Sequence, residues 1–369
     1  MESLLTSILG NNILTTVIYC ALPLMFVLAY ALIAVLGEVK ISAWMQDRLG
    51  PMRTGPWGII QPLADVLKLL QKEDITPSES DKFLFNFAPF LVFMGSYAAF
   101  AAIPFSSQYV GASLDLGIFY VFAVGSIGVV GLMMAGWASN NKYSLYGAMR
   151  SVAQIVSYEV PGAMALMIIV IFMGSLNLQD IIVAQGGGIW NWFVFGGPKS
   201  DVLLGNGRML HATWSNLVFF PLFLATFVMY YISALAETNR TPFDIPEAES
   251  ELVSGYHTEY AGMKFAMFFM AEYANMFLVS VVAAIAFFGG WQSPYGTTIG
   301  ALVGVPWLSP VEEFLWLAFK GFFFVFVMIW LRWTLPRLRV DQLMYMCWKV
   351  LIPFSFGIAL VVGFLVVIM

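Results

Sequence analysis

The stretch LGIFYVFAVGSIGVVGLMMAGW, from Leu116 to Trp137, carries no charged side chain. It is long enough to cross the hydrocarbon core of a bilayer as a helix. The rest of the chain has the same character, because 60% of its 369 residues are hydrophobic and 11% are charged. Soluble domains carry roughly 25% charged residues. The sequence therefore predicts an integral membrane protein.

Similar runs recur along the chain and predict about eight membrane-spanning helices, since lipid offers no partner for backbone polar groups. The expected fold class is all-α, a polytopic bundle that forms one membrane domain over residues 1–369. The first run is expected to be a retained span, because MESLLTSILGNN lacks the basic residues of a signal peptide. The eight runs are Ile13 to Leu36, Phe83 to Ile103, Leu116 to Trp137, Val152 to Leu176, Leu217 to Ala236, Met263 to Phe288, Phe314 to Leu331 and Trp348 to Ile368. Kinks or span ends are predicted at Pro23, Pro89, Pro161, Pro221 and Pro353.

The basic residues predict the orientation. Most of the 17 Lys and Arg residues lie in the loops after the first, third, fifth and seventh runs, whereas the opposite loops hold only Lys199 and Arg208. The positive-inside rule then puts the basic loops in the cytoplasm and both termini on the outer side. The expected location is the inner (plasma) membrane of a bacterium.

The first cytoplasmic loop, residues 38–82, contains the segment WGIIQPLADVLKLLQK from Trp57 to Lys72. Its apolar residues recur at helical spacing opposite Asp65 and Lys68, which predicts an amphipathic helix on the cytoplasmic surface. Two interpretations stay open. The helix packs on its own bundle, or it frames an entrance from the lipid.

The chain lacks the residues that hold a redox centre or a metal. Haem and iron–sulfur sites need paired histidines or several cysteines, whereas this chain has His211 and His257 in predicted loops and Cys20 and Cys347 far apart. Neither histidine lies in a metal motif. No basic block indicates a nucleic-acid partner. Electron transfer would therefore require cofactors held by partner subunits.

Ionisable residues inside spans are costly and often functional. Glu159 lies two residues before Pro161, Glu272 lies within the sixth run and Lys320 lies within the seventh. A structural ion pair or a proton relay explains each glutamate, and the flexible stem of Lys320 could reach the membrane interface.

The cytoplasmic loop of residues 237–263 is acidic. A helix is predicted to begin at Asp244, with Pro246 in its first turn and Glu247 three residues after the cap. Apolar residues interleave with the acids, which suggests an enclosed wet cavity rather than a solvated surface. Clustered carboxylates of this kind raise one another's pKa. The acids are Glu237, Asp244, Glu247, Glu249, Glu251 and Glu259.

Three long strings resemble the H-type membrane component of respiratory complex I, the proton-pumping NADH:quinone oxidoreductase. They are QDRLGPMRTGPWGIIQPLADVLKLLQKEDITP from Gln46, NNKYSLYGAMRSVAQIVSYEVP from Asn140 and PFDIPEAESELVSGYHTEYAGMKF from Pro242. The resemblance covers nearly the whole chain. It implies a membrane component that meets the hydrophilic and membrane arms of the complex and forms much of a tunnel where quinone, the substrate, is reduced.

The resemblance also implies roles for individual residues. The expected quinone-site residues are Arg48, Arg53, Trp57, Arg240, Phe243, Asp244, Glu247, Glu249 and Glu251. The expected proton path comprises Tyr158, Glu159, Glu237, Tyr260 and Glu272. Electrons would come from NADH through FMN and iron–sulfur clusters on partner subunits. One departure is that Glu38-Val39-Lys40 keeps a single basic residue where many relatives have two, which weakens any role for this corner.

Two rival functions are a related component of a membrane-bound hydrogenase and a secondary transporter. The full tunnel-loop strings argue against the hydrogenase, and no repeat between the halves supports the transporter. The sequence leaves open whether the quinone is ubiquinone or menaquinone. It assigns no role to Lys320 or to the Gly-rich loop from Gln179 to Asn216.

Overall fold

The computed structural model describes residues 13–198, 202–203, 209–210, 216–245, 253–298, 300, 304 and 308–368. Eight of its helical segments are long and apolar enough to cross a membrane, which confirms the predicted count. The long helices are α2 (Ile13–Met45), α4 (Lys82–Ala99), α5 (Gly117–Ala138), α6 (Lys142–Met173), α8 (Asn216–Glu237), α10 (Gly262–Phe287), α12 (Leu308–Thr334) and α14 (Ile352–Ile368).

Short elements join them. They are η1 (Pro56–Gly58), α3 (Gln61–Gln71), η2 (Phe100–Ala102), α7 (Leu178–Ala184), η3 (Ile189–Asn191), η4 (Phe193–Phe195), η5 (Gly255–His257), α13 (Val340–Tyr345) and the π-helix η6 (Met346–Leu351). The two-residue strands β1 (Val202–Leu203) and β2 (Met209–Leu210) pair antiparallel, and the other described elements are helical. The predicted all-α class is therefore confirmed.

Two predicted helix boundaries are wrong by about ten residues. Helix α6 begins at Lys142, not Val152, because Asn141 caps it by accepting a hydrogen bond from the Tyr143 N–H at 2.9 Å. Helix α2 continues to Met45 instead of ending at Leu36. An apolar run marks the part of a helix that lies in lipid, whereas helical hydrogen bonding continues into polar sequence. The extension of α2 places Glu38 inside a helix.

Proline ends none of four predicted spans. Pro23, Pro89, Pro161 and Pro221 lie inside α2, α4, α6 and α8, and each helix continues past its proline. Pro353 follows the π-helix η6 at the start of α14. The prediction of span ends at the first four prolines is therefore wrong.

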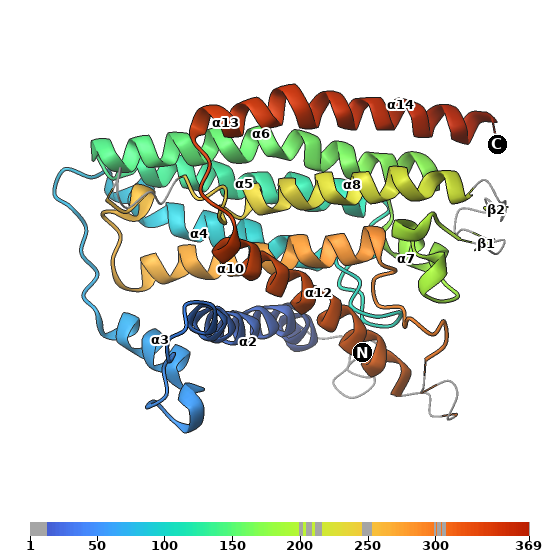
Figure 1. Cartoon of the computed structure of the whole chain (residues 1–369). Coiled ribbons are helices and arrows are strands. Elements are labelled where there is room, and N and C mark those ends of the chain that lie inside the picture. The colour runs from blue at the N-terminus through green and yellow to red at the C-terminus, as the bar shows by residue number, and fades with distance from the viewer. Residues whose placement is uncertain are drawn as a thin grey trace.

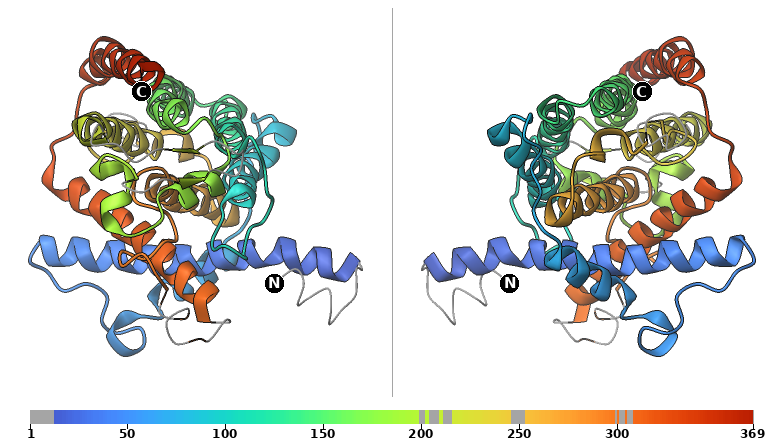
Figure 2. Two further views of the ribbon diagram at one scale, coloured as in Figure 1. Left: turned by 90° about the vertical axis from the view of Figure 1, so that its right-hand side faces the viewer. Right: turned by 90° about the vertical axis from the view of Figure 1, so that its left-hand side faces the viewer.

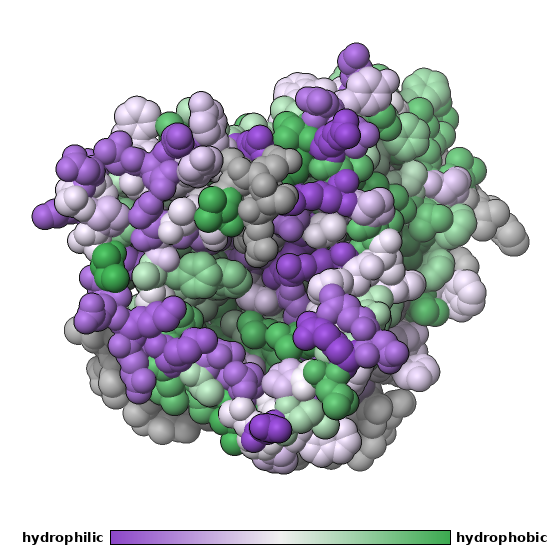
Figure 3. All heavy atoms as spheres, turned by 60° about the vertical axis from the view of Figure 1, so that its left-hand side comes forward, coloured by the Kyte–Doolittle hydropathy of each residue, from purple (hydrophilic) through white to green (hydrophobic). Residues whose placement is uncertain are grey.

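Most long helices run side by side, but α2 lies across them and α12 runs obliquely (Figure 1, Figure 2). Helix α10 is the central helix, because it packs against α4, α12, α8 and α2 and is buried along nearly all of its second half. We call the end of the bundle at which α8 ends and α10 begins the acidic-loop end. The opposite end, where α7 lies, is the α7 end. Hydrophilic residues gather at the acidic-loop end, which Figure 3 brings forward.

Candidate functional site

The start of the acidic loop folds back into the protein and is held there by Gln154 of α6. The amide nitrogen Nε2 of Gln154 donates hydrogen bonds to the carbonyl oxygens of Ala236 and Phe243, both at 2.8 Å, and to Oδ1 of Asn239 at 3.1 Å. Gln154 is 2% exposed. A single buried side chain thus fixes both ends of the turn that carries Arg240.

Arg240 lies at the centre of a buried group of charges. Its Nη1 is 2.7 Å from Oε1 of Glu38, its Nε is 3.0 Å from Oε1 of Glu272, and its guanidinium lies 5.0 Å from the centre of the Tyr273 ring. Arg240 is 5% exposed. Burial alone would lower its pKa, but the adjacent Glu272 and Glu38 carboxylates outweigh burial and hold the pKa above its usual range.

Glu38 gathers partners from three other segments. Besides Arg240, its carboxylate accepts hydrogen bonds from the guanidinium of Arg332 on α12 and, at 2.8 Å, from the hydroxyl of Tyr273 on α10. We call Glu38, Arg240, Glu272, Tyr273 and Arg332 the charge cluster. It contains two carboxylates and two guanidinium groups, so its formal charges balance. Such balance is what allows ionised groups to stay charged away from water.

Sequence reasoning selected Arg240 and Glu272 but assigned no role to Glu38 or Arg332. One signal was available for Glu38, because an acidic residue closely follows the first apolar run. The lack of a second basic residue beside Lys40 made this corner look unimportant. The structure instead supplies the positive charge from Arg240 and Arg332, which are 202 and 294 residues away in sequence.

A lateral groove opens beside the charge cluster, between α2 and α12. Its cavity has a volume of about 430 Å³. The trough is apolar and aromatic, and its lining residues are Ile41, Trp44, Met45, Phe326 and Trp330. The two helices are joined next to it by a 2.7 Å hydrogen bond from Nε1 of Trp333 to Oγ of Ser42. The groove suits a long apolar ligand that arrives from lipid.

The amphipathic helix exists as α3, although it begins at Gln61 rather than Trp57. Its apolar residues Ile59, Ile60, Leu63, Leu67 and Leu70 are 47–59% exposed. The chain itself therefore leaves this face uncovered, which disfavours the interpretation that α3 packs its apolar face on its own bundle.

The other predicted quinone-site residues are placed apart from the charge cluster. Arg48, Arg53 and Trp57 are exposed on the segment between α2 and α3. Phe243 is buried, and its ring centre is 5.2 Å from that of Tyr158. Asp244 Oδ1 lies 3.8 Å from Nη2 of Arg337. Glu247, Glu249, Glu251 and the predicted start of a helix around Pro246 lie outside the described residues.

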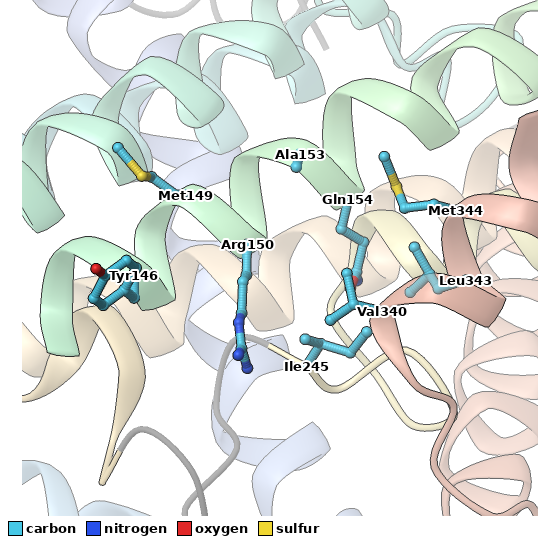
Figure 4. Close-up of a pocket in the computed structure, with 9 residues that line it drawn as sticks. All are labelled: Tyr146, Met149, Arg150, Ala153, Gln154, Ile245, Val340, Leu343 and Met344. Carbon is cyan, nitrogen blue, oxygen red and sulfur yellow. The ribbon is translucent and has the colours of Figure 1, made fainter.

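A cavity of about 200 Å³ lies between α6, α13 and Ile245. Figure 4 shows Arg150 and Gln154 on the α6 side and Val340, Leu343 and Met344 on the α13 side of it. The cavity lies directly next to the folded-back turn that Gln154 holds.

The predicted proton-path tyrosines make structural contacts. The hydroxyl of Tyr158 donates to the carbonyl of Leu343 at 3.0 Å and ties α6 to α13. The hydroxyl of Tyr260 donates to the carbonyl of Phe85 at 3.2 Å, and the two rings stack with centres 4.1 Å apart. Burial raises the pKa of Tyr260.

The predicted proton-path glutamates lie at two places. Glu272 is part of the charge cluster. Glu159 faces α5, where its Oε1 accepts a hydrogen bond from Oγ of Ser126 at 3.2 Å. Glu237 is the last residue of α8, and its carboxylate and that of Glu159 repel each other electrostatically. Two carboxylates that repel in this way form a second polar site along α6 and α8.

Within the described part of the chain, no three His, Cys, Asp or Glu residues are grouped so that they could hold a metal ion. His257 is buried in η5, between the rings of Phe265 and Phe268, with centres 5.4 Å from each. Its position is that of a packed loop residue, as expected from the sequence.

The fold and the charge cluster together describe a multi-pass membrane protein with balanced ionised groups inside its bundle. The family model for NADH dehydrogenase matches residues 17–363. The H subunit of NADH-quinone oxidoreductase from Chlorobaculum tepidum is 54% identical over 92% of this chain and 89% of that protein. The protein of the same name from Chlorobium luteolum is 53% identical over 92% of this chain and 86% of its own. A second such relative, from Cytophaga hutchinsonii, is 43% identical over 93% of this chain and 97% of its own.

This chain belongs to the NADH dehydrogenase family, in the branch formed by the H-type membrane components of NADH-quinone oxidoreductase. The resemblance drawn from the three sequence strings is confirmed.

Proposed function

We propose that this chain is the membrane component of an NADH:quinone oxidoreductase that admits quinone from the lipid and couples its reduction to proton translocation. Membership of the family and the names of the relatives support the enzyme and the type of component. The tunnel and the coupling are inferred from the residues described below.

The observation that carries the proposal is that two helices each contribute to both the groove and the charge cluster. Helix α2 carries Glu38 in the cluster and Ile41 in the groove, one helical turn apart. Helix α12 carries Arg332 in the cluster and Trp330 in the groove. An apolar quinone tail in the groove would therefore lie within about one turn of helix of the buried charges.

The charge cluster would respond strongly to a change of charge nearby. One unit charge at about 4 Å from another interacts by about 4 kcal/mol at an effective dielectric constant of about 20. A negative charge that appears as quinone is reduced, or a proton that is withdrawn, would unbalance Arg240 between Glu38 and Glu272. Because Gln154 joins Arg240's turn to α6, the imbalance would be felt by the loop and by α6 together.

We assign the quinone site to the groove, the charge cluster, the segment with Arg48, Arg53 and Trp57, and the acidic loop with Phe243, Asp244, Glu247, Glu249 and Glu251. The proton path in this proposal uses Glu272, Glu237 and Glu159, with Tyr158 and Tyr260 holding the neighbouring helices in place. The donor cofactors, FMN and iron–sulfur clusters, belong to partner subunits of the hydrophilic arm. The acidic-loop end faces the cytoplasm of a bacterium, and both termini face the outer side.

The experiment is to purify the tagged chain with its native partners and to measure inhibitor-sensitive NADH:quinone reductase activity. A groove variant, Ile41→Trp, is compared with Ile33→Trp, which changes an exposed isoleucine of the same helix outside the groove. We expect Ile41→Trp to raise the KM for a long-tailed quinone about tenfold, because the added ring fills the groove, and Ile33→Trp to leave it unchanged.

Equal KM values for the two variants would remove the groove from the quinone path. Recovery of nickel–iron hydrogenase subunits without quinone reductase activity would overturn the proposed function as a whole.

A further inference from the structure

Lys320 and the loop after α6, neither of which has a role that the sequence predicts, meet at the α7 end. The first part of this loop is part of the protein core, since Ile181, Ile182, Gln185 and Phe193 are fully buried. The loop therefore enters the end of the bundle instead of lying over it.

Gln185 satisfies backbone groups from both the loop and α10. Its Nε2 donates to the carbonyls of Ile181 at 3.1 Å and Ile285 at 2.8 Å. Its Oε1 accepts from the N–H groups of Phe193 at 3.2 Å and Gly289 at 2.9 Å. Four hydrogen bonds from one buried amide leave no polar group of this side chain for water.

Lys320 does not reach the membrane interface. Its Nζ donates to the carbonyls of Phe288, Gly290 and Gln292, each at 2.8 Å, just past the end of α10. Three acceptors match the three N–H donors of an ammonium group, and a helix C-terminus favours a positive charge. The ammonium also lies 4.3 Å from the centre of the Trp192 ring, on the loop. In the part of the chain that the structure describes, no carboxylate pairs with Lys320.

An apolar layer separates Lys320 from the charge cluster. From Met276 to Phe287, α10 carries only buried apolar side chains apart from Ser280, whose hydroxyl donates to the carbonyl of Met276 at 2.7 Å. A cation that moved along α10 from Glu272 would cross this layer and then meet a fixed positive charge.

We propose that Lys320 and the loop segment 178–195 seal the α7 end against protons and other cations. The apolar layer holds little water, and the buried ammonium adds an electrostatic barrier of the kind that excludes cations from selective pores. This inference rests on the proposed function, because a protein that handles protons at the charge cluster must keep them from escaping through its opposite end.

The test measures passive proton leak in the resting complex. The purified whole complex is placed in liposomes, a pH step is imposed without NADH, and an internal pH-sensitive dye follows its decay. Trp192→Glu puts a carboxylate beside the ammonium and cancels its charge, whereas Trp192→Gln removes the same ring without adding charge. We expect the leak to rise about tenfold in Trp192→Glu only, because unit charges roughly 10 Å apart interact by an energy worth about a factor of ten in rate.

Lys320→Met gives a second measurement, with Lys349→Met at an exposed position as its control. The expected result is a similar rise for Lys320→Met alone. Equal leak in Trp192→Glu and Trp192→Gln would overturn the seal. The quinone reductase rate of the same vesicles reports separately on the proposed function, since the leak is measured without turnover.

Discussion

Replacement of Gln154 by leucine should disable quinone reduction while leaving the protein folded. The variant keeps the volume of the buried side chain but removes the donor of three hydrogen bonds. The carbonyl of Ala236 keeps the N–H of Asn239 as a partner, so its loss is about 1 kcal/mol. The carbonyl of Phe243 is left buried without its amide donor, which costs about 1–3 kcal/mol.

These losses total about 2–4 kcal/mol and act on the turn that places Arg240 between Glu38 and Glu272. At about 1.4 kcal/mol per factor of ten, the lower figure already reduces the population of the native turn about thirtyfold relative to displaced turns. The rest of α6 keeps its packing, including the bond from Tyr158 to Leu343. The prediction therefore concerns the turn and not the bundle.

The assay compares two electron acceptors in the assembled complex. NADH:quinone reductase activity should fall by at least about tenfold, whereas NADH:ferricyanide reductase activity, which bypasses the membrane component, should not change. Gln154→Glu should be as severe, because a carboxylate cannot donate to the two carbonyls. Gln108→Leu, at an exposed glutamine, serves as the control. A fully assembled Gln154→Leu complex with the normal quinone rate would refute the reasoning.

Two further pairs of variants test the packing around the site. Arg240→Met should lower the thermal midpoint of the complex much more than Arg332→Met, because it removes a fully buried partner worth about 3–5 kcal/mol, whereas the Arg332 side chain is 29% exposed and contributes about 1 kcal/mol or less. Equal shifts by differential scanning fluorimetry would contradict this. Gly147→Ala should also lower the midpoint, since its Cβ would lie 2.7 Å from Cα of Gly255, whereas Gly125→Ala meets nothing within 4 Å and should be neutral. A destabilised Gly125→Ala would show that α5 is in contact there with a partner.

The number of spanning helices could be predicted because lipid leaves the backbone no choice but to satisfy itself within each run. Helix ends could not be predicted from the same rule. Helix α6 starts ten residues before its apolar run, at an Asn141 cap, and α2 continues through Glu38 and Lys40 to Met45. Hydropathy measures transfer into lipid and is silent where a helix continues in water or against other helices.

The arrangement of the helices was also beyond the sequence. Nothing in the apolar run of α2 indicates that it lies across the bundle, because the run is hydrophobic on all sides. This crossing is what brings Glu38 to Arg240 and Ile41 to the flank of α12. Individual charged residues could be selected from their cost in a membrane, but the pairing of Arg240 with Glu38 depends on contact between segments 202 residues apart.

Lys320 shows the same limit in the opposite direction. A long flexible side chain near an apolar run is usually expected to extend to the interface. Here the end of α10 lies closer than the interface and offers three carbonyls in one place, so the ammonium is held inside. The favourable alternative was created by tertiary structure, which a sequence pattern does not contain.

The distribution of charge along α10 gives the site its direction. At the acidic-loop end, Glu272 and Tyr273 belong to a cluster whose two carboxylates and two guanidinium groups balance, so the gain or loss of one proton there changes its net charge from zero. In the middle, the helix is apolar. At the α7 end, its carbonyls hold a single ammonium. A charge generated at the cluster is therefore opposed along α10 and is left with the polar residues beside it, toward Glu237 and Glu159 on α8 and α6. This asymmetry is what a coupling protein needs, because a proton displaced by quinone chemistry performs work only if one of its two exits is closed.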